Sequence, residues 1–94
     1  MLIPGYKNSF KKDVKLLKKR KKDIKKLYDI ISDLINQKPL ARKHVDHPLK
    51  GEYGDCRECH IEPDWLLIYL IKENIKENSI TFIRTGTHSD LFKK

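Results

Sequence analysis

The chain has 94 residues, 38% of them hydrophobic and 36% charged, and its formal net charge at pH 7 is +8. A chain of this length favours one domain, spanning residues 1–94, and its apolar residues recur in periodic blocks that exclude a disordered polymer. Eleven basic and two acidic residues fall within positions 1–26, so this third carries all the excess positive charge and favours nucleic acid, an anionic membrane surface or an acidic protein as partner.

The sequence shows no signal for export or membrane insertion. Pro4 and Lys7 interrupt the N-terminus, so the first methionine is not followed by the apolar segment of a signal peptide. The longest apolar run, residues 65–71, is too short to cross a bilayer. We therefore expect a cytoplasmic protein without membrane contacts, in which the two cysteines stay reduced.

The N-terminal half predicts a short strand followed by two helices. The strand covers residues 2–6, and Asn8 or Ser9 would cap a lysine-rich first helix. The charged run 18–22 holds the turn, and a second helix over 23–37 stops before Pro39; so short a connection favours an antiparallel helix pair. The helical spacing predicts these buried residues: Phe10, Val14, Leu16 and Leu17, then Ile24, Leu27, Tyr28, Ile31, Leu34 and Ile35.

The C-terminal half predicts three strands after an irregular segment. The middle strand is apolar throughout, as expected of a strand covered on both faces. The order β-α-α-β-β-β indicates an α+β fold with two helices packed on a small, mostly antiparallel sheet. The expected segments are the irregular stretch 40–54, strands 56–61, 65–71 and 79–85, the tight turn 62–64, the hairpin loop 72–78, and a final helical turn with Leu91 and Phe92.

This topology brings residues that are far apart in the sequence to one end of the sheet. If the last three strands fold back and forth, the first and the third run in the same direction. Both then stop at the same end of the sheet, where the middle strand begins. His60 ends the first strand, and Arg84 with His88 ends the third. The residues expected to converge there are His60, Asp64, Trp65, Arg84 and His88, and His47 in the preceding loop can reach the same cleft.

Such a set suits RNA cleavage by the RNA's own 2′-OH group. The reaction needs a base, an acid and a cation that stabilises the charged phosphorane, and histidine and arginine supply these without a metal or cofactor. His88 would be the acid and His60, supported by Asp64, the base; the two roles could be exchanged, or His47 could be the base. Arg84 would stabilise the phosphorane.

Each of these residues alone also has an ordinary structural interpretation. Trp65 at a strand start is typical of a core residue, and Asp64 after Pro63 is typical of a turn. An aromatic such as Trp65, Tyr53 or Phe92 could also stack an unpaired base. The expected convergence is what favours the functional interpretation.

The cysteines match two other patterns. Cys56, Cys59 and His60 fit the spacing of c-type haem attachment, which we reject because no export signal is present. Strand residues three apart face opposite sides of a sheet, so Cys56 and Cys59 would not share a zinc ion or a disulfide unless the segment were a loop. We expect no haem and no metal, with Cys59 packed inward and Cys56 incidental.

Four motifs occur along the whole chain in a fixed order. With them, the chain resembles the YafQ branch of the RelE superfamily of toxins. They are KKDVKL at 11–16, DHPL at 46–49 with Gly51, RECHIEPDW at 57–65 followed by LLIY, and RTGTHSDLF at 84–92.

The resemblance implies an mRNA interferase that cuts codons in the ribosomal A site and is blocked by a co-expressed antitoxin. It implies catalytic roles for His47, His60, Asp64, Arg84 and His88. The residues expected to bind RNA are Trp65, Phe92, Lys11, Lys15 and Lys18, with the basic first helix on ribosomal RNA. The two cysteines and a longer 72–78 loop depart from the family pattern. The alternative is a protein of the same fold that binds RNA or antitoxin without cleaving.

Overall fold

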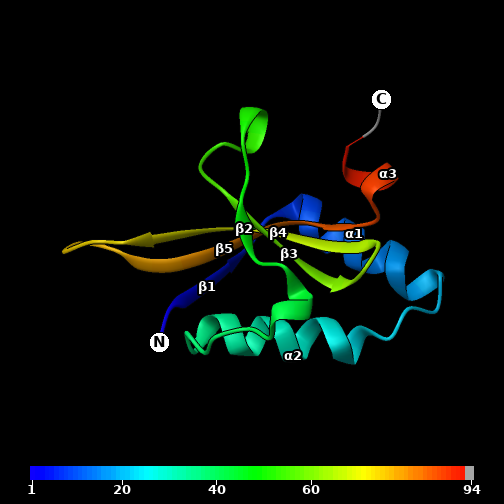
Figure 1. Ribbon diagram of the computed structural model, residues 1–94, viewed down its shortest axis with the longest axis horizontal. Helices are drawn as coiled ribbons and strands as arrows, with labels where there is room; N and C mark the ends of the chain where they lie inside the picture. The colour runs from blue at the N-terminus through cyan, green and yellow to red at the C-terminus, as the bar shows by residue number, and fades with distance from the viewer. Residues whose placement is uncertain (93–94) are drawn as a thin grey trace.

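A five-stranded sheet organises the computed structural model, which describes residues 1–92 (Figure 1). The strands lie in the order β1-β5-β4-β3-β2; the first pair is parallel and the other three are antiparallel, which confirms the predicted α+β class. In chain order the elements are β1 (Ile3–Tyr6), α1 (Asn8–Lys19), α2 (Ile24–Ile35), the 3-10 turn η1 (Arg42–His44), β2 (His47–Pro48), the 3-10 turn η2 (Gly51–Tyr53), β3 (Arg57–Glu62), β4 (Trp65–Glu73), β5 (Asn78–Gly86) and α3 (His88–Leu91).

The strands β3, β4 and β5 fold back and forth as the sequence predicts. The hairpin between the last two is tighter than expected, because β4 extends to Glu73 and β5 already begins at Asn78. The strand β2 pairs with β3 through His47 and Pro48. The sequence did not indicate it, since a two-residue strand leaves no periodic pattern. Together these pairings bring the end of β3, the start of β4 and the end of β5 to the same end of the sheet.

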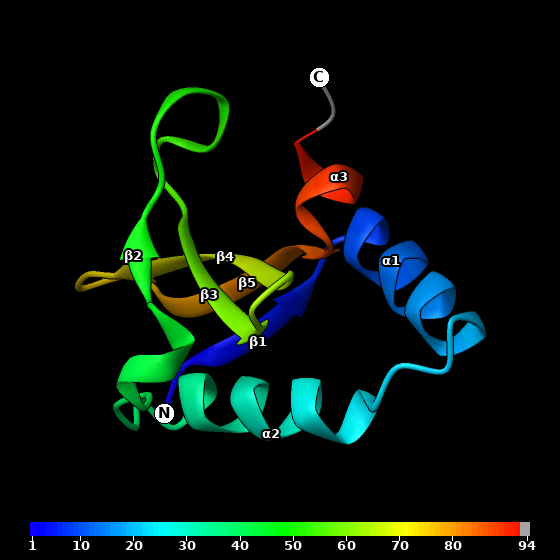
Figure 2. The same ribbon diagram turned by 45° about the vertical axis from the view of Figure 1, so that its right-hand side comes forward.

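The long helices α1 and α2 lie on one face of the sheet. α1 packs mainly against β5, and α2 contacts both α1 and β3. The chain turns back between the helices as predicted, so α2 runs roughly against the direction of α1 (Figure 1), but the two helices splay apart and their apolar stripes face the sheet (Figure 2). Among residues 1–92, no helix is long and apolar enough to span a membrane.

The N-terminus of α1 also differs from the expectation. The helix already includes Asn8, and Lys7 occupies the N-cap position without a side-chain cap. The side chain of Ser9 donates a 2.7 Å hydrogen bond to the carbonyl of Ile83 instead. This bond ties the start of α1 to β5.

The core under the helices contains most of the predicted residues, with two corrections. Tyr28 and Leu16 are 49% and 42% exposed, whereas Ile30, which we did not predict, is buried. Successive helix residues are rotated by about 100°. The buried stripe of α2 is centred on Leu27 and Ile31, so Tyr28 falls at its outer edge.

The strand β4 is covered on both faces, as predicted. Trp65, Leu67 and Tyr69 belong to the core beneath α1 and α2. Leu66 and Ile68 belong to a second, smaller core on the opposite face, which α3 and the segment around η2 help to cover (Figure 2). β4 therefore holds the two layers together.

The cysteines lie in different cores. Cys59 is fully buried under the helices, and Cys56 is buried in the smaller core on the other face. Both are free thiols, and burial raises the pKa of each, so neither is a ready thiolate ligand. A shared zinc ion or disulfide is excluded by this placement.

We predict that Leu67→Ala lowers the free energy of unfolding by about 2–5 kcal/mol, because it leaves a cavity in the central strand. Urea denaturation measures this loss. The matched control is Ile75→Ala at the fully exposed hairpin tip, which should change stability by less than about 0.5 kcal/mol. Equal effects of the two substitutions would contradict the assignment of Leu67 to the core.

Candidate active site

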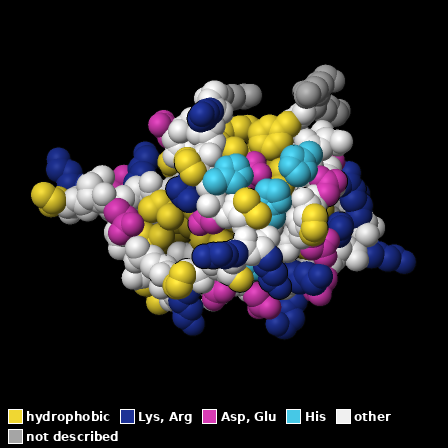
Figure 3. All heavy atoms as spheres, in the orientation of Figure 1, with side chains coloured by type: hydrophobic (Ala, Val, Ile, Leu, Met, Phe, Trp, Pro, Cys, Tyr) yellow, Lys and Arg dark blue, Asp and Glu magenta, His cyan; other side chains and the backbone are white. Residues whose placement is uncertain are grey.

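Three imidazole rings lie in a row on the sheet face opposite the long helices. The ring centroids of His47 and His60 are 6.3 Å apart, and those of His60 and His88 are 5.8 Å apart. The rings come from β2, β3 and the start of α3, and histidines gather on one face in Figure 3. The predicted convergence of these residues is confirmed.

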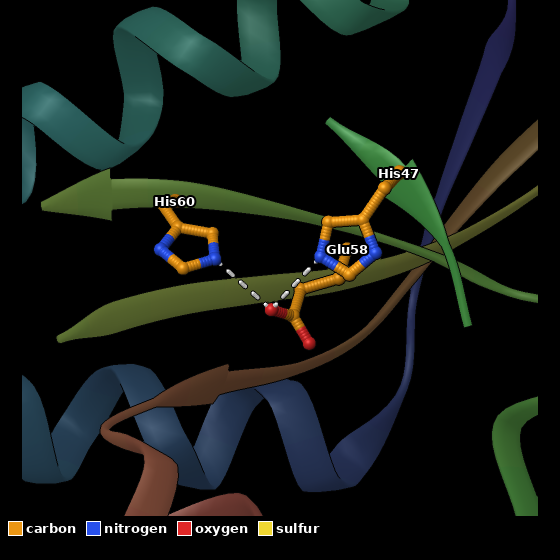
Figure 4. Close-up of side chains that lie close together, drawn as sticks. All are labelled: His47, Glu58 and His60. Carbon is orange, nitrogen blue, oxygen red and sulfur yellow. Dashed lines mark ion pairs between the residues drawn. The ribbon is translucent and has the colours of Figure 1, made fainter. Parts of the chain in front are cut away.

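A buried carboxylate lies between two of the rings. The side chain of Glu58 is 6% exposed, and its Oε1 is 3.5 Å from Nε2 of His47 and 3.2 Å from Nε2 of His60 (Figure 4). The sequence analysis missed Glu58. A strand alternates its faces, so the inward Cys59 places Glu58 and His60 together on the other side; this signal could have found it.

Backbone carbonyls fix the orientation of both rings. Nδ1 of His47 is 3.1 Å from the carbonyl oxygen of Pro48, and Nδ1 of His60 is 3.3 Å from that of Pro63. A carbonyl only accepts hydrogen bonds, so both Nδ1 atoms carry a proton. In both rings Nε2 is consequently the atom that faces Glu58.

The carboxylate of Asp64 holds His88 rather than His60. Its Oδ1 accepts hydrogen bonds from the backbone N–H of His88 at 2.9 Å and from the ring Nδ1 at 2.6 Å. The predicted support of His60 by Asp64 is therefore wrong, because the turn before β4 directs this carboxylate toward α3. The two hydrogen bonds, that of the backbone first, lower the pKa of Asp64. Nε2 is then the ring atom of His88 that substrate can reach.

The helical turn that carries His88 is anchored at both sides. Thr87 and Asp90 form a capping box, in which each side chain accepts a backbone N–H of the other residue. Arg20 at the end of α1 binds Asp90 through two hydrogen bonds of 2.7 and 3.1 Å, and this contact lowers the pKa of Asp90. A side chain at Gly86 would lie 2.9 Å from the Asp90 carboxylate, so glycine permits this close approach.

Arg84 is held by a carboxylate of α1. Its Nε and Nη2 donate to the two oxygens of Asp13 at 2.6 and 3.1 Å, and this pairing raises the pKa of Arg84. Asp13, which belongs to the KKDVKL motif, also accepts the backbone N–H of Thr85 at 3.0 Å. Asp13 thus fixes both the side chain and the strand that carries it.

Strand register places Arg84 on the same face as Glu58. Glu58 pairs with Ile68, and Ile68 pairs with Arg84. On the other side of β3, His47 pairs with Glu58. Residues paired across antiparallel strands point to the same face, so these four form one row across the sheet. The row combines an imidazole, a carboxylate, an apolar floor and a guanidinium.

The family of the chain follows from comparison with known proteins. A family model described as a bacterial toxin of type II toxin–antitoxin systems, YafQ, matches residues 3–93. The chain belongs to the YafQ family of toxins. This confirms the resemblance found in the motifs.

Several relatives cover nearly the whole chain of this YafQ-family toxin. It is 44% identical over 88 residues to the mRNA interferase toxin YafQ of Escherichia coli K12, a match that covers 93% of this chain and 91% of the relative. The E. coli DinJ-YafQ toxin–antitoxin complex has a TM-score of 0.86 and 42% identity, and the match covers 97% of each chain. A metal-bound toxin from Helicobacter pylori has a TM-score of 0.88 and 47% identity, and the match covers 98% of this chain and 100% of that chain.

Some of the predicted RNA-binding residues lie elsewhere. Trp65 is fully buried and donates a 2.9 Å hydrogen bond to Thr85, so the prediction that it stacks a base is wrong. Phe92 is 38% exposed and meets Tyr53 edge to face at 6.2 Å. The three predicted lysines line a groove with Tyr6 on the helix side, away from the histidine row; they are Lys11, Lys15 and Lys18.

We predict that Asp64 titrates below the ordinary range of an aspartate in a carbon-detected NMR pH titration. In His88→Ala the pKa should rise only partway, because the backbone N–H of residue 88, the larger contributor, remains. A depressed pKa stabilises the fold above the ordinary value, and this contribution fades as the pH falls through the folded value. A complete return to the ordinary pKa in His88→Ala would refute the backbone hydrogen bond.

We also predict that Asp13→Ala lowers the free energy of unfolding by about 1–3 kcal/mol, because the half-buried Arg84 loses its paired carboxylate. Urea denaturation gives the value. Asp29→Ala is the control, since the ion pair of Asp29 with Lys25 is largely exposed and contributes about 0.5 kcal/mol or less. A loss in Asp13→Ala no larger than in the control would count against this anchoring role.

Proposed function

We propose that this chain is an endoribonuclease that cleaves translated mRNA on the ribosome, through acid–base catalysis without a metal ion. The observation that carries this proposal is the 5.8 Å separation of the His60 and His88 rings, which suits two groups that flank one phosphodiester. The relative in E. coli that bears the name mRNA interferase toxin supports the substrate class.

In this mechanism His60 removes the proton of the 2′-OH group. The Pro63 carbonyl keeps the proton on Nδ1, so Nε2 of the neutral ring carries the lone pair that accepts it. The positive charge that develops lies 3.2 Å from the Glu58 carboxylate. The 2′-oxygen then attacks phosphorus, and a 2′,3′-cyclic phosphate forms as the bond to the 5′-oxygen breaks.

His88 protonates the leaving 5′-oxygen. Its Nδ1 is bound to Asp64, which fixes the ring orientation and leaves the Nε2 proton for transfer. Arg84 stabilises the charged phosphorane from the same sheet face, oriented by Asp13. His47, close to Glu58, contributes further positive charge when protonated.

The remaining surfaces fit the proposed partners. The basic residues of positions 1–26 suit ribosomal RNA, which restricts cleavage to translated mRNA in the cytoplasm. Phe92 and Tyr53 offer an aromatic pair on which a base can stack. The E. coli DinJ-YafQ complex supports a cognate antitoxin as partner.

A metal ion is a further ligand to consider. The related H. pylori toxin is named as metal-bound, and we propose that this chain also binds a metal ion, outside the catalytic cycle.

We predict that His88→Ala and His60→Ala each reduce cleavage by roughly 10²–10⁴-fold, because each removes one proton-transfer group. The measurement is the rate of cleavage of mRNA on programmed ribosomes, with the 5′ ends mapped, in a buffer whose only divalent metal is the Mg²⁺ that ribosomes require. Growth arrest on induction gives an independent reading. Ile75→Ala, at the exposed hairpin tip, is the control and should cleave like wild type.

Two outcomes would refute the proposal. A folded wild-type protein that neither arrests growth nor cuts translated mRNA is not an interferase. If a His60/His88 double alanine variant acts like wild type on ribosomes, the chain is instead a binding protein that does not cleave. Loss of cleavage when a chelator selective for transition metals is added in the presence of Mg²⁺, restored by added transition metal, would refute the metal-free mechanism alone.

A further inference from the structure

The strand β2, which carries His47, is too short to fix its own position. It pairs with β3 through two residues, His47 with Glu58 and Pro48 with Arg57. It lies at the edge of the sheet, and among residues 1–92 no strand pairs with its other side. So short a pairing frays easily, and contacts outside the strand must therefore hold His47 beside Glu58.

The turn that leads into β2 is held in an unfavourable conformation. Val45 has a backbone φ of 44°, in the left-handed region that β-branched residues rarely adopt. Val45 is 53% exposed, so burial of its side chain does not compensate for the strain. Such a conformation persists only where neighbouring contacts fix the chain. One of these contacts precedes Val45, since Nδ1 of His44 lies 2.7 Å from the carbonyl oxygen of His60.

The contact that follows this turn is made by Asp46. Its Oδ1 accepts a 2.6 Å hydrogen bond from the Tyr69 hydroxyl and a 3.0 Å hydrogen bond from Nε of Arg57. Tyr69 is 1% exposed in the core beneath the helices, and burial, together with Asp46, raises the pKa of its hydroxyl. The hydroxyl therefore keeps its proton and donates it to the hydrogen bond. A buried side chain of the central strand thus holds the carboxylate that precedes His47.

The contacts of Asp46 and the histidine row lie on opposite faces of the sheet. Arg57 pairs with Tyr69 across β3 and β4, whereas its neighbour Glu58 pairs with His47. Successive residues of a strand point to opposite faces, so Asp46 reaches the helix side while His47 points to the other side. Figure 4 shows the ring of His47 directed from β2 toward Glu58. The position of Asp46 therefore controls the 3.5 Å separation between Nε2 of His47 and Oε1 of Glu58.

We propose that Asp46 is a positioning residue for His47, and that it acts in the proposed cleavage only through this ring. Both partners of the Asp46 carboxylate lie on the helix side, so the carboxylate does not touch RNA bound at the histidine row. Its removal frees β2 and moves the charge of His47 away from Glu58 and the phosphorane. The kinetic part of this proposal rests on the proposed function; the positional part does not.

The positional test is an NMR comparison of the imidazole signals of the whole chain without RNA. Asp46→Ala removes both contacts, and Tyr69→Phe removes the hydroxyl while the ring stays in the core. In each variant we expect the ring ¹H and ¹³C signals of His47 to shift, while those of His88, which Asp64 holds, stay near their wild-type positions. Unchanged His47 signals in folded Asp46→Ala, or equal shifts at both histidines, would overturn the positioning role.

Two matched controls separate a local effect from a general one. Tyr28→Phe removes an exposed hydroxyl from α2, and Asp29→Ala removes a largely exposed carboxylate from the same helix. Neither should shift the His47 signals, and neither should change cleavage by more than about twofold. Circular dichroism confirms that each variant is folded at the temperature of the assays.

The kinetic test is a double-mutant cycle on programmed ribosomes, with Mg²⁺ as the only divalent metal. Asp46→Ala should lower kcat by about tenfold and leave KM nearly unchanged, because it displaces a charge that acts in the transition state. In a His47→Ala background the same substitution should have no further effect on kcat, since the ring that it positions is gone. An equal loss in both backgrounds would overturn the proposal, because Asp46 would then act on the fold or on another group.

The two tests distinguish failure of this inference from failure of the proposed function. If the chain never cleaves translated mRNA, the proposed function fails, and the NMR comparison still decides whether Asp46 positions His47. If wild type cleaves and folded Asp46→Ala cleaves at the same rate, this inference fails and the proposed function stands. If Asp46→Ala does not fold, Tyr69→Phe decides both tests, with the same directions expected.

Discussion

The antiparallel pairing of β3 with β4 and of β4 with β5 is the constraint on which the rest of the molecule depends. It aligns His47, Glu58, Ile68 and Arg84 in one row, although they are scattered along the chain. A register slip of one residue would turn Glu58 toward the helices and Cys59 toward the face that carries the histidines. The burial of β4 on both faces makes such a slip costly, because every side chain of its first half lies in a core.

The sheet carries charged side chains that would destabilise the fold if they were buried without a partner of opposite charge. The buried carboxylate of Glu58 loses hydration, and the facing imidazoles offset this loss only when they bring positive charge. Arg84 and Asp13 show the same compensation, with a paired guanidinium and carboxylate partly removed from water. The helix-side core therefore stabilises a face whose own polar groups contribute little to folding. This division allows the site to be organised for chemistry.

The sequence predicts which residues lie together at the site, but not which of them bind one another. The back-and-forth order of the last three strands is enough to bring His60 and His88 together, because it fixes which strand ends lie side by side. The partner of Asp64 depends on side-chain direction after a turn, which periodicity does not encode. The two-residue period places Glu58 beside His60, but the period alone does not show that this carboxylate is buried between two imidazoles. Trp65 has the aromatic ring that base stacking needs, but its place at the start of a strand covered on both faces buries it.

The proposed chemistry depends on the groups that surround His60. The Pro63 carbonyl contacts Nδ1 of this ring at 3.3 Å, which leaves Nε2 as the nitrogen that can take the 2′-OH proton. The same Nε2 atom lies 3.2 Å from the buried Glu58 carboxylate, which stabilises the positive charge that forms on the ring. His47 differs, because proton transfer is assigned to His60 and His88 while His47 lies on a two-residue strand at the edge of the sheet. A substitution at His47 should therefore disturb the proposed proton transfers less than one at His60.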